Sequence, residues 1–197
     1  MTLVELLVAS GLSLVIMTML TTMLTVYAKA DTATVNNANA AANVRLALLA
    51  LQHDIQSANP LGTLSTVAAY NDKLQLTIQP SGQLITWQYS YTSVNCPGTS
   101  STWCGTLTRQ AGSNTPVTEL TAVTNGDPSN GGLSVFSYYD HCAINQVTEP
   151  QATPASVSAS TTVVQITLSV ANLNSAPYGT TTRVNLMNQP PGASRCG

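Results

Sequence analysis

Charged side chains are scarce in this chain of 197 residues, because Asp, Glu, Lys and Arg together make up only 7% of it. Six Lys and Arg residues stand against eight Asp and Glu residues, which gives a formal net charge of −2. A chain without an excess of positive charge lacks the long-range field that attracts polyanions. We therefore expect no direct binding of nucleic acid.

Residue patterns that carry catalysis are also missing. The sequence contains no Gly-x-Ser-x-Gly, no phosphate-binding loop, no His-Glu-x-x-His and no dinucleotide fingerprint. Its two histidines, His53 and His141, lie far apart in the sequence and make a Ser/His/Asp arrangement hard to build. Asp127 and Asp140 do not follow the spacing of an EF-hand calcium loop. We expect a protein that is not an enzyme and that holds no cofactor.

Cysteine is rare and confined to the later part of the chain, at Cys96, Cys104, Cys142 and Cys196. An even number of cysteines in a chain with a membrane-type segment indicates disulfides formed in an oxidising compartment. Three pairings can be drawn, and free thiols or a metal site are the other interpretations. A Cys96–Cys104 bond would close a short loop rich in Pro, Gly and Ser, and a Cys142–Cys196 bond would tie the C-terminal tail to the body.

Residues 1–28 carry no charged side chain except Glu5. A helix of this length measures about 42 Å, which exceeds the roughly 30 Å apolar core of a bilayer. A cleavable signal peptide is the competing interpretation, but it would begin with basic residues and contain a shorter apolar stretch. The segment therefore predicts a helix that spans a membrane.

Glu5 is a candidate functional residue, because a carboxylate within an apolar helix is costly unless it finds a cation. If Met1 is a mature N-terminus, its α-amino group is the nearest such cation, in the same chain or in a neighbouring one. A pair between two chains would set the axial register of one helix against the next. The alternative is an isolated polar residue at a membrane interface.

The helix is predicted to continue through residues 29–58, because no proline or glycine occurs there before Asn59-Pro60 ends it. Its apolar residues form one helical stripe, which we expect to lie on the rest of the protein. The stripe consists of Val44, Leu48, Leu51 and Ile55. The side chains expected to face elsewhere or to be solvated are Arg45, Gln52, His53, Asp54 and Gln56.

Residues 60–197 are predicted to form a β-rich head, because apolar and polar residues alternate between clusters of Gly, Asn and Pro. Strands are expected at residues 74–78, 85–91, 106–109, 117–123, 133–139, 164–170 and 184–186. Gly82 marks a turn, and residues 149–162 are expected to form a loop. A long helix (about 1–58) packed on an antiparallel sheet is an α+β fold. The expected parts are residues 1–28, 29–59 and 60–197.

The string from Met1 to Ala9, MTLVELLVA, resembles the mature N-terminus of type IV pilins and of type II secretion pseudopilins. The resemblance implies that a prepilin peptidase cuts before Met1, that this residue is N-methylated, and that Glu5 serves assembly. Phe is the usual first residue. The helix-bending proline of many pilins is also missing, so any loosening of the helix in a filament is expected between Gly11 and Thr25.

The later part of the chain is most similar to larger minor pilins and to J-type minor pseudopilins. The strings that carry this resemblance are Leu51–Ile55, Leu107–Arg109, Val135–Asp140 and Arg183–Leu186. The C-terminal disulfide loop of pilins would map onto Cys142 and Cys196, which favours that pair together with Cys96–Cys104.

The resemblance implies a non-enzymatic subunit that polymerises with copies of itself or with other pilins. It also implies a protein held in the inner membrane until an ATPase-driven machine assembles it into a filament at the cell surface. The alternatives are a membrane-anchored monomeric adhesin or binding domain, and a minor pseudopilin of a type II secretion system.

Overall fold

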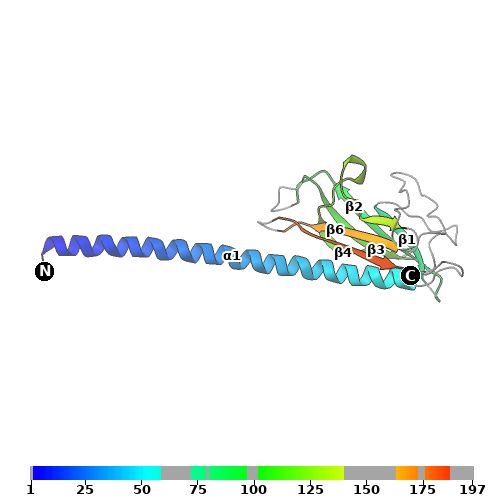
Figure 1. The fold of residues 1–197 in the computed structure, drawn as a ribbon, viewed down its shortest axis with the longest axis horizontal. Helices are drawn as coiled ribbons and strands as arrows, with labels where there is room; N and C mark the ends of the chain where they lie inside the picture. The colour runs from blue at the N-terminus through cyan, green and yellow to red at the C-terminus, as the bar shows by residue number, and fades with distance from the viewer. Residues whose placement is uncertain are drawn as a thin grey trace, which may run out of the picture. The chain divides into compact units, whose positions relative to one another are not determined.

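The computed structural model describes residues 2–58, 72–78, 80–96, 102–139, 163–172 and 176–186. Within these residues a single long helix precedes an antiparallel sheet, so the predicted α+β class is confirmed (Figure 1). The elements are α1 (Leu3–Ser57), β1 (Lys73–Ile78), β2 (Gln83–Thr92), β3 (Cys104–Ala111), β4 (Val117–Val123), η1 (Pro128–Asn130), β5 (Phe136–Tyr139), β6 (Val163–Val170) and β7 (Tyr178–Asn185).

The chain divides into two compact units, residues 1–39 and residues 40–197. The first unit consists of the earlier part of α1, where every described side chain from residue 2 to residue 32 is exposed. Its hydroxyl groups bond back to the helix, as when Ser13 Oγ donates to the Ala9 carbonyl at 2.9 Å and Thr21 Oγ1 donates to the Met17 carbonyl at 2.9 Å. These bonds satisfy the hydroxyl donors without water, so the residues suit an apolar environment.

The second unit begins with the last turns of α1, which lie along the sheet (Figure 1). Val44, Leu51 and Ile55 of the predicted stripe are buried, and Leu48 packs against the core while remaining half-buried. Fully burying one such aliphatic side chain stabilises the fold by about 1.5–3 kcal/mol. The sheet supplies the largest fully buried partners: Trp87, Tyr89, Tyr138, Phe136, Leu107 and Ile166.

The sheet has the strand order β1-β2-β3-β4-β6-β5, with β7 paired to β6, and all pairs are antiparallel. The β1–β2 hairpin turns at Gly82, whose φ of 67° is the left-handed conformation that favours glycine. The strands β4 and β6 pair only at Val123 and Val170. The main ladders are therefore the one from β1 to β4 and the one formed by β5, β6 and β7.

The predicted strand at residues 106–109 extends in the structure from Cys104 to Ala111, and two further predicted strands begin at other residues than expected. The strand expected at residues 133–139 begins only at Phe136, because Gly132 donates its amide to the Asp127 carbonyl at 2.8 Å and so belongs to a loop. The strand expected at residues 184–186 runs instead from Tyr178 to Asn185. After Tyr178, residues 179–182 of this strand are Gly and Thr, which give no apolar alternation to detect in the sequence. The predicted loop at residues 149–162 lies outside the described residues.

Candidate functional site

The N-terminus of α1 is closed by a capping box, in which Thr2 and Glu5 bond to each other. The Thr2 amide donates to Glu5 Oε2 at 2.8 Å, and the Glu5 amide donates to Thr2 Oγ1 at 3.4 Å. This reciprocal arrangement satisfies two amide donors that a helix start otherwise leaves unpaired. Thr-x-x-Glu before an apolar run is the sequence signature of this motif, whereas the sequence analysis sought only a cationic partner for Glu5. Met1 lies outside the described residues.

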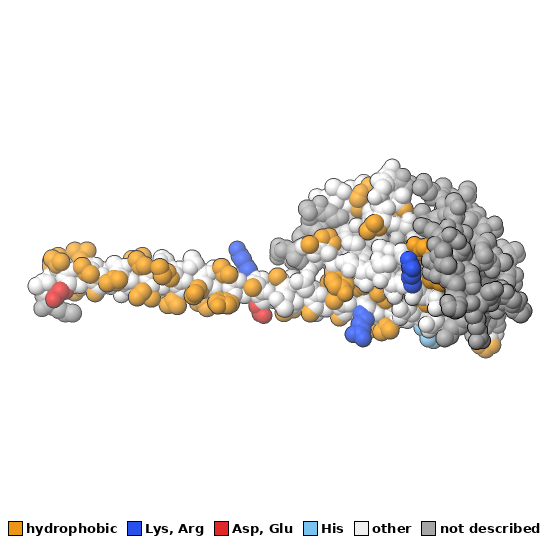
Figure 2. All heavy atoms as spheres, in the orientation of Figure 1, with side chains coloured by type: hydrophobic (Ala, Val, Ile, Leu, Met, Phe, Trp, Pro, Cys, Tyr) orange, Lys and Arg blue, Asp and Glu red, His pale blue; other side chains and the backbone are white. Residues whose placement is uncertain are grey.

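The surface that follows Glu5 carries no charged side chain on any side of the helix up to Lys29. Figure 2 shows orange apolar side chains along this part of α1 with few charged ones among them. By length and composition α1 can cross a membrane, and its most apolar stretch is not buried within the protein. A backbone in helical form hydrogen-bonds to itself and therefore tolerates lipid. The helix is compatible with membrane association.

Asp54 is buried, so the prediction that it is solvated was wrong. Its side chain is only 2% exposed and accepts three hydrogen bonds from the sheet. Arg109 of β3 donates to it through Nε at 2.7 Å and Nη2 at 3.0 Å, and Trp87 of β2 donates through Nε1 at 2.9 Å. Such a bidentate arrangement compensates for the desolvation of the carboxylate. The cluster fastens α1 to the sheet.

The residues around Asp54 support this structural role. Hydrogen bonding to Asp54 raises the pKa of the Arg109 guanidinium further, so the cation is permanent. His53 has a 78% exposed side chain, as predicted for a residue on the solvated face. Gln52 was expected to face away but is half-buried, and its Nε2 donates to Thr182 Oγ1 of β7 at 3.5 Å.

A second polar cluster lies at the end of β2 and in the loop before β5. The Tyr91 hydroxyl donates to Asp127 Oδ1 at 2.8 Å, and Asn130 Nδ2 donates to Asp127 Oδ2 at 2.6 Å. Burial, together with the bond to Asp127, raises the pKa of Tyr91 to about 12, so this phenol stays protonated at neutral pH. The ring of Trp103 meets that of Tyr91 edge-on at a centroid distance of 5.7 Å. The cluster closes this end of the sheet.

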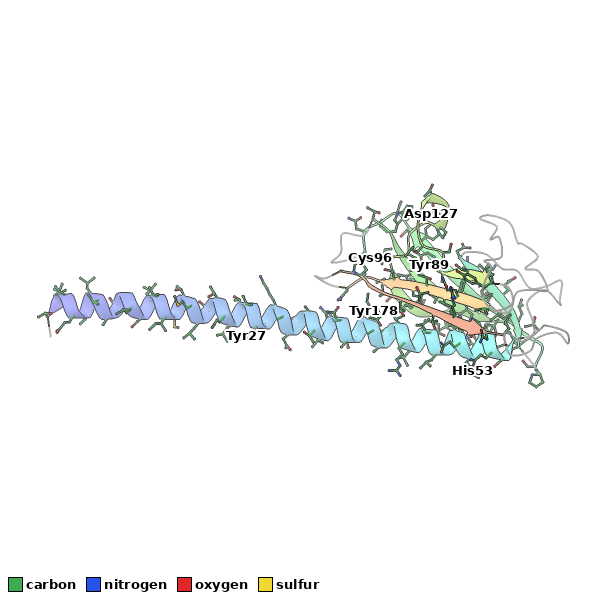
Figure 3. All side chains as sticks on the ribbon, in the orientation of Figure 1. Tyr27, His53, Tyr89, Cys96, Asp127 and Tyr178 are labelled. Atoms are coloured by element: carbon green, nitrogen blue, oxygen red, sulfur yellow. A yellow bond between two sulfur atoms is a disulfide. The ribbon has the colours of Figure 1, made fainter. Side chains whose placement is uncertain are left out.

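A disulfide joins Cys96 to Cys104, so the predicted bond across the Pro/Gly/Ser loop is present. Figure 3 shows Cys96, Tyr89 and Asp127 in the same part of the second unit. Cys142 and Cys196, as well as Asp140 and His141, lie outside the described residues. Among the described residues no group of three or more His, Cys, Asp or Glu side chains is arranged to hold a metal ion.

A groove of about 580 Å³ lies between α1 and the start of β7. Val44 and Leu48 line it from the helix, and Tyr178 and Thr180 line it from the strand. Arg45 forms part of its wall and is the charged side chain that lines it. The groove therefore combines apolar walls with one cation.

Comparisons with models of known protein families, with curated proteins and with solved structures gave no match to this chain. A helix followed by an antiparallel sheet is nevertheless the order of elements found in pilins. The geometry and the sequence must therefore support any assignment of function.

Proposed function

We propose that this chain is a structural subunit of a bacterial type IV pilus or a related filament, and that it polymerises through α1. The observation that carries the proposal is the surface of residues 6–28, which lacks charge and is exposed on all sides. An apolar surface of this length is stable only against lipid or against other helices. The same helix then packs onto its own sheet, which would be exposed outside the filament core.

Glu5 gains a specific role in this proposal. In the single chain its Oε2 accepts the Thr2 amide. A carboxylate offers about four acceptor sites, so the other oxygen remains able to accept a further donor. The N-terminal amine of a neighbouring copy is that donor. Glu5 therefore caps its own helix and pairs with the next copy at the same time.

This pair matters because moving a helix from lipid into a bundle of helices gains little hydrophobic energy. Lipid tails are already as apolar as leucine, so close packing and polar contacts decide how transmembrane helices associate. An acid at one fixed position, paired with the amine of the next copy, would set the stagger between copies.

Before assembly the subunit resides in the inner membrane. A prepilin peptidase and an ATPase-driven machine would process and extract it.

The experiment separates capping from pairing by comparing three variants in a bacterium that assembles the filament. Glu5→Gln keeps a capping-box side chain but removes the charge, because Gln also fills this position in capping boxes. Glu5→Leu removes both functions, and Thr2→Ala removes only the hydroxyl of the cap. We measure the protein in filaments sheared from cells, the protein in membranes, and the mass of the N-terminal peptide.

We expect both Glu5 variants to remain folded in the membrane and to be lost from the sheared fraction, with Thr2→Ala close to wild type. Normal incorporation of Glu5→Gln would show that Glu5 serves only as a cap. If the wild-type protein itself never leaves the membrane in long polymers, α1 is a plain anchor. The chain would then be a monomeric adhesin or binding domain. Labelling confined to one end of the filaments would instead indicate a minor pilin or pseudopilin.

A further inference from the structure

The face of α1 opposite to the core carries an exposed stripe within the second unit, made of apolar residues and one arginine. We call it the outer stripe; it consists of Ala42, Arg45, Leu46 and Leu49. These residues follow the spacing of one helix face, and Leu46 and Leu49 are 67% and 53% exposed. Leu46 and Leu49 are neighbours on this face of the helix, and both leave apolar surface uncovered.

Arg45 gives this surface a charge without a counter-charge. It is exposed, and no hydrogen bond or ion pair to it occurs within the described part of the chain. It also borders the groove between α1 and β7. Partners that fit the outer stripe must therefore be apolar and must carry an acid at one position.

Residues 28–35 of the same helix have that composition at the same spacing. Ala28, Asp31, Thr32 and Val35 occupy the positions that Ala42, Arg45, Leu46 and Leu49 occupy fourteen residues later. All four are exposed, and Asp31 likewise has no hydrogen bond or ion pair within the described residues. Within one helix, side chains meet at spacings of three or four, so Asp31 and Arg45 of the same chain do not pair.

We infer that the outer stripe of one copy docks residues 28–35 of a second copy, with Asp31 of one chain paired to Arg45 of the other. The inference rests on the proposed filament. Two parallel helices shifted by fourteen residues, about 21 Å, bring Asp31 beside Arg45 and Val35 beside Leu49. The same shift places Ala28 beside Ala42, and two small residues let helices approach closely.

Charge reversal tests the pair, because both side chains are exposed and unpaired and their reversal should leave the fold intact. We compare Asp31→Arg, Arg45→Asp and the double variant with the wild type. Exposed ion pairs change an association constant by up to about fivefold, and like charges act in the opposite direction. We expect each single variant to lower the yield of sheared filaments by about fivefold and the double variant to restore it.

Cysteine cross-linking gives an independent readout in the same filaments. A chain carrying Asp31→Cys together with Arg45→Cys should form disulfide-linked ladders of several copies. The matched control pairs Lys29→Cys with Arg45→Cys, because Lys29 is two residues from Asp31 and faces another side of the helix. We expect no ladder from the control.

The two proposals fail in different ways. Suppose that the wild type forms filaments. If both single reversals then leave the filament yield unchanged, or if the test and control cysteine pairs give equal ladders, the Asp31–Arg45 contact is overturned and the filament proposal stands. The contact is equally overturned if Arg45→Asp lowers filament yield and Asp31→Arg does not, since Arg45 would then bind another partner. The absence of wild-type filaments overturns the filament proposal itself.

Discussion

The two ends of α1 are equally helical but are stabilised in different ways. Residues 3–28 have exposed apolar side chains and depend on backbone hydrogen bonds, with hydroxyl groups bonding back to the helix. Residues 40–57 bury one stripe against a sheet and add the bonds of Asp54 to Trp87 and Arg109. Secondary structure alone therefore does not tell which part of a helix belongs to the core of its own chain.

Residues 40–57 also contain exposed apolar side chains. Leu46 and Leu49 lie among buried neighbours but are themselves exposed, so they resemble residues 3–28 rather than the core. A helix that is apolar on two opposite faces has one face left for another molecule. Substitutions on the two faces should therefore have different effects on stability.

The largest effect is expected from Asp54→Ala, which leaves the half-buried Arg109 guanidinium and the buried Trp87 indole without their acceptor. Removing one partner of a buried pair costs about 3–5 kcal/mol. We expect a loss of that size in the free energy of unfolding, measured by urea denaturation of the full chain in detergent. His53→Ala is the matched control and should change it by less than about 0.5 kcal/mol. A loss below 1 kcal/mol for Asp54→Ala would show that the cluster does not fasten α1 to the sheet.

The next effect compares the two faces of α1 directly. Leu51→Ala empties a fully buried position and should cost about 2–5 kcal/mol, whereas Leu46→Ala removes an exposed side chain and should cost less than about 0.5 kcal/mol. Denaturation of the monomer in detergent measures both. Equal losses would mean that Leu46 also packs in the core, and the outer stripe would no longer be available for docking.

A smaller effect is expected from the disulfide, which braces the second unit and has no counterpart in residues 3–28. Replacing both Cys96 and Cys104 by Ser opens a loop with a sequence separation of 8. The loop-entropy relation gives a loss of about 2.5 kcal/mol for so short a loop. Thermal unfolding with and without a reductant measures this loss. If the Cys96–Cys104 bond is the one that the reductant opens, the reductant should no longer lower the stability of the variant.

Much of this contrast could be predicted from the sequence. The uncharged run, the stripe that contains Val44 and Leu51, and the α+β order all follow from periodicity and composition. The Cys96–Cys104 bond was one of three possible pairings and was favoured because it closes a short loop. These features depend on residues close in the sequence, so they need no knowledge of the fold.

Asp54 shows why the rest could not be predicted. Its partners lie 33 and 55 residues away along the chain, on two neighbouring strands, and only the pairing of Trp87 with Arg109 across those strands brings them together. An acid in a helix is usually solvated, so burial could not be inferred without those partners. The Thr2–Glu5 capping box was different, because its signature was in the sequence and was overlooked.

The smallest effect should come from deleting residues 1–28. None of the described residues 2–28 is part of the second unit's core, so the deletion should change the free energy of unfolding by no more than about 0.5 kcal/mol. The shortened protein should also stay in solution without detergent. Deleting residues 1–46 is the matched comparison, because it additionally removes the buried Ala40 and Val44 and should destabilise the sheet unit by several kcal/mol. If both deletions are equally harmless, the helix stripe does not hold the head together. If both deletions lower the free energy of unfolding equally, residues 1–28 also stabilise the second unit, and the two ends of α1 are not independent.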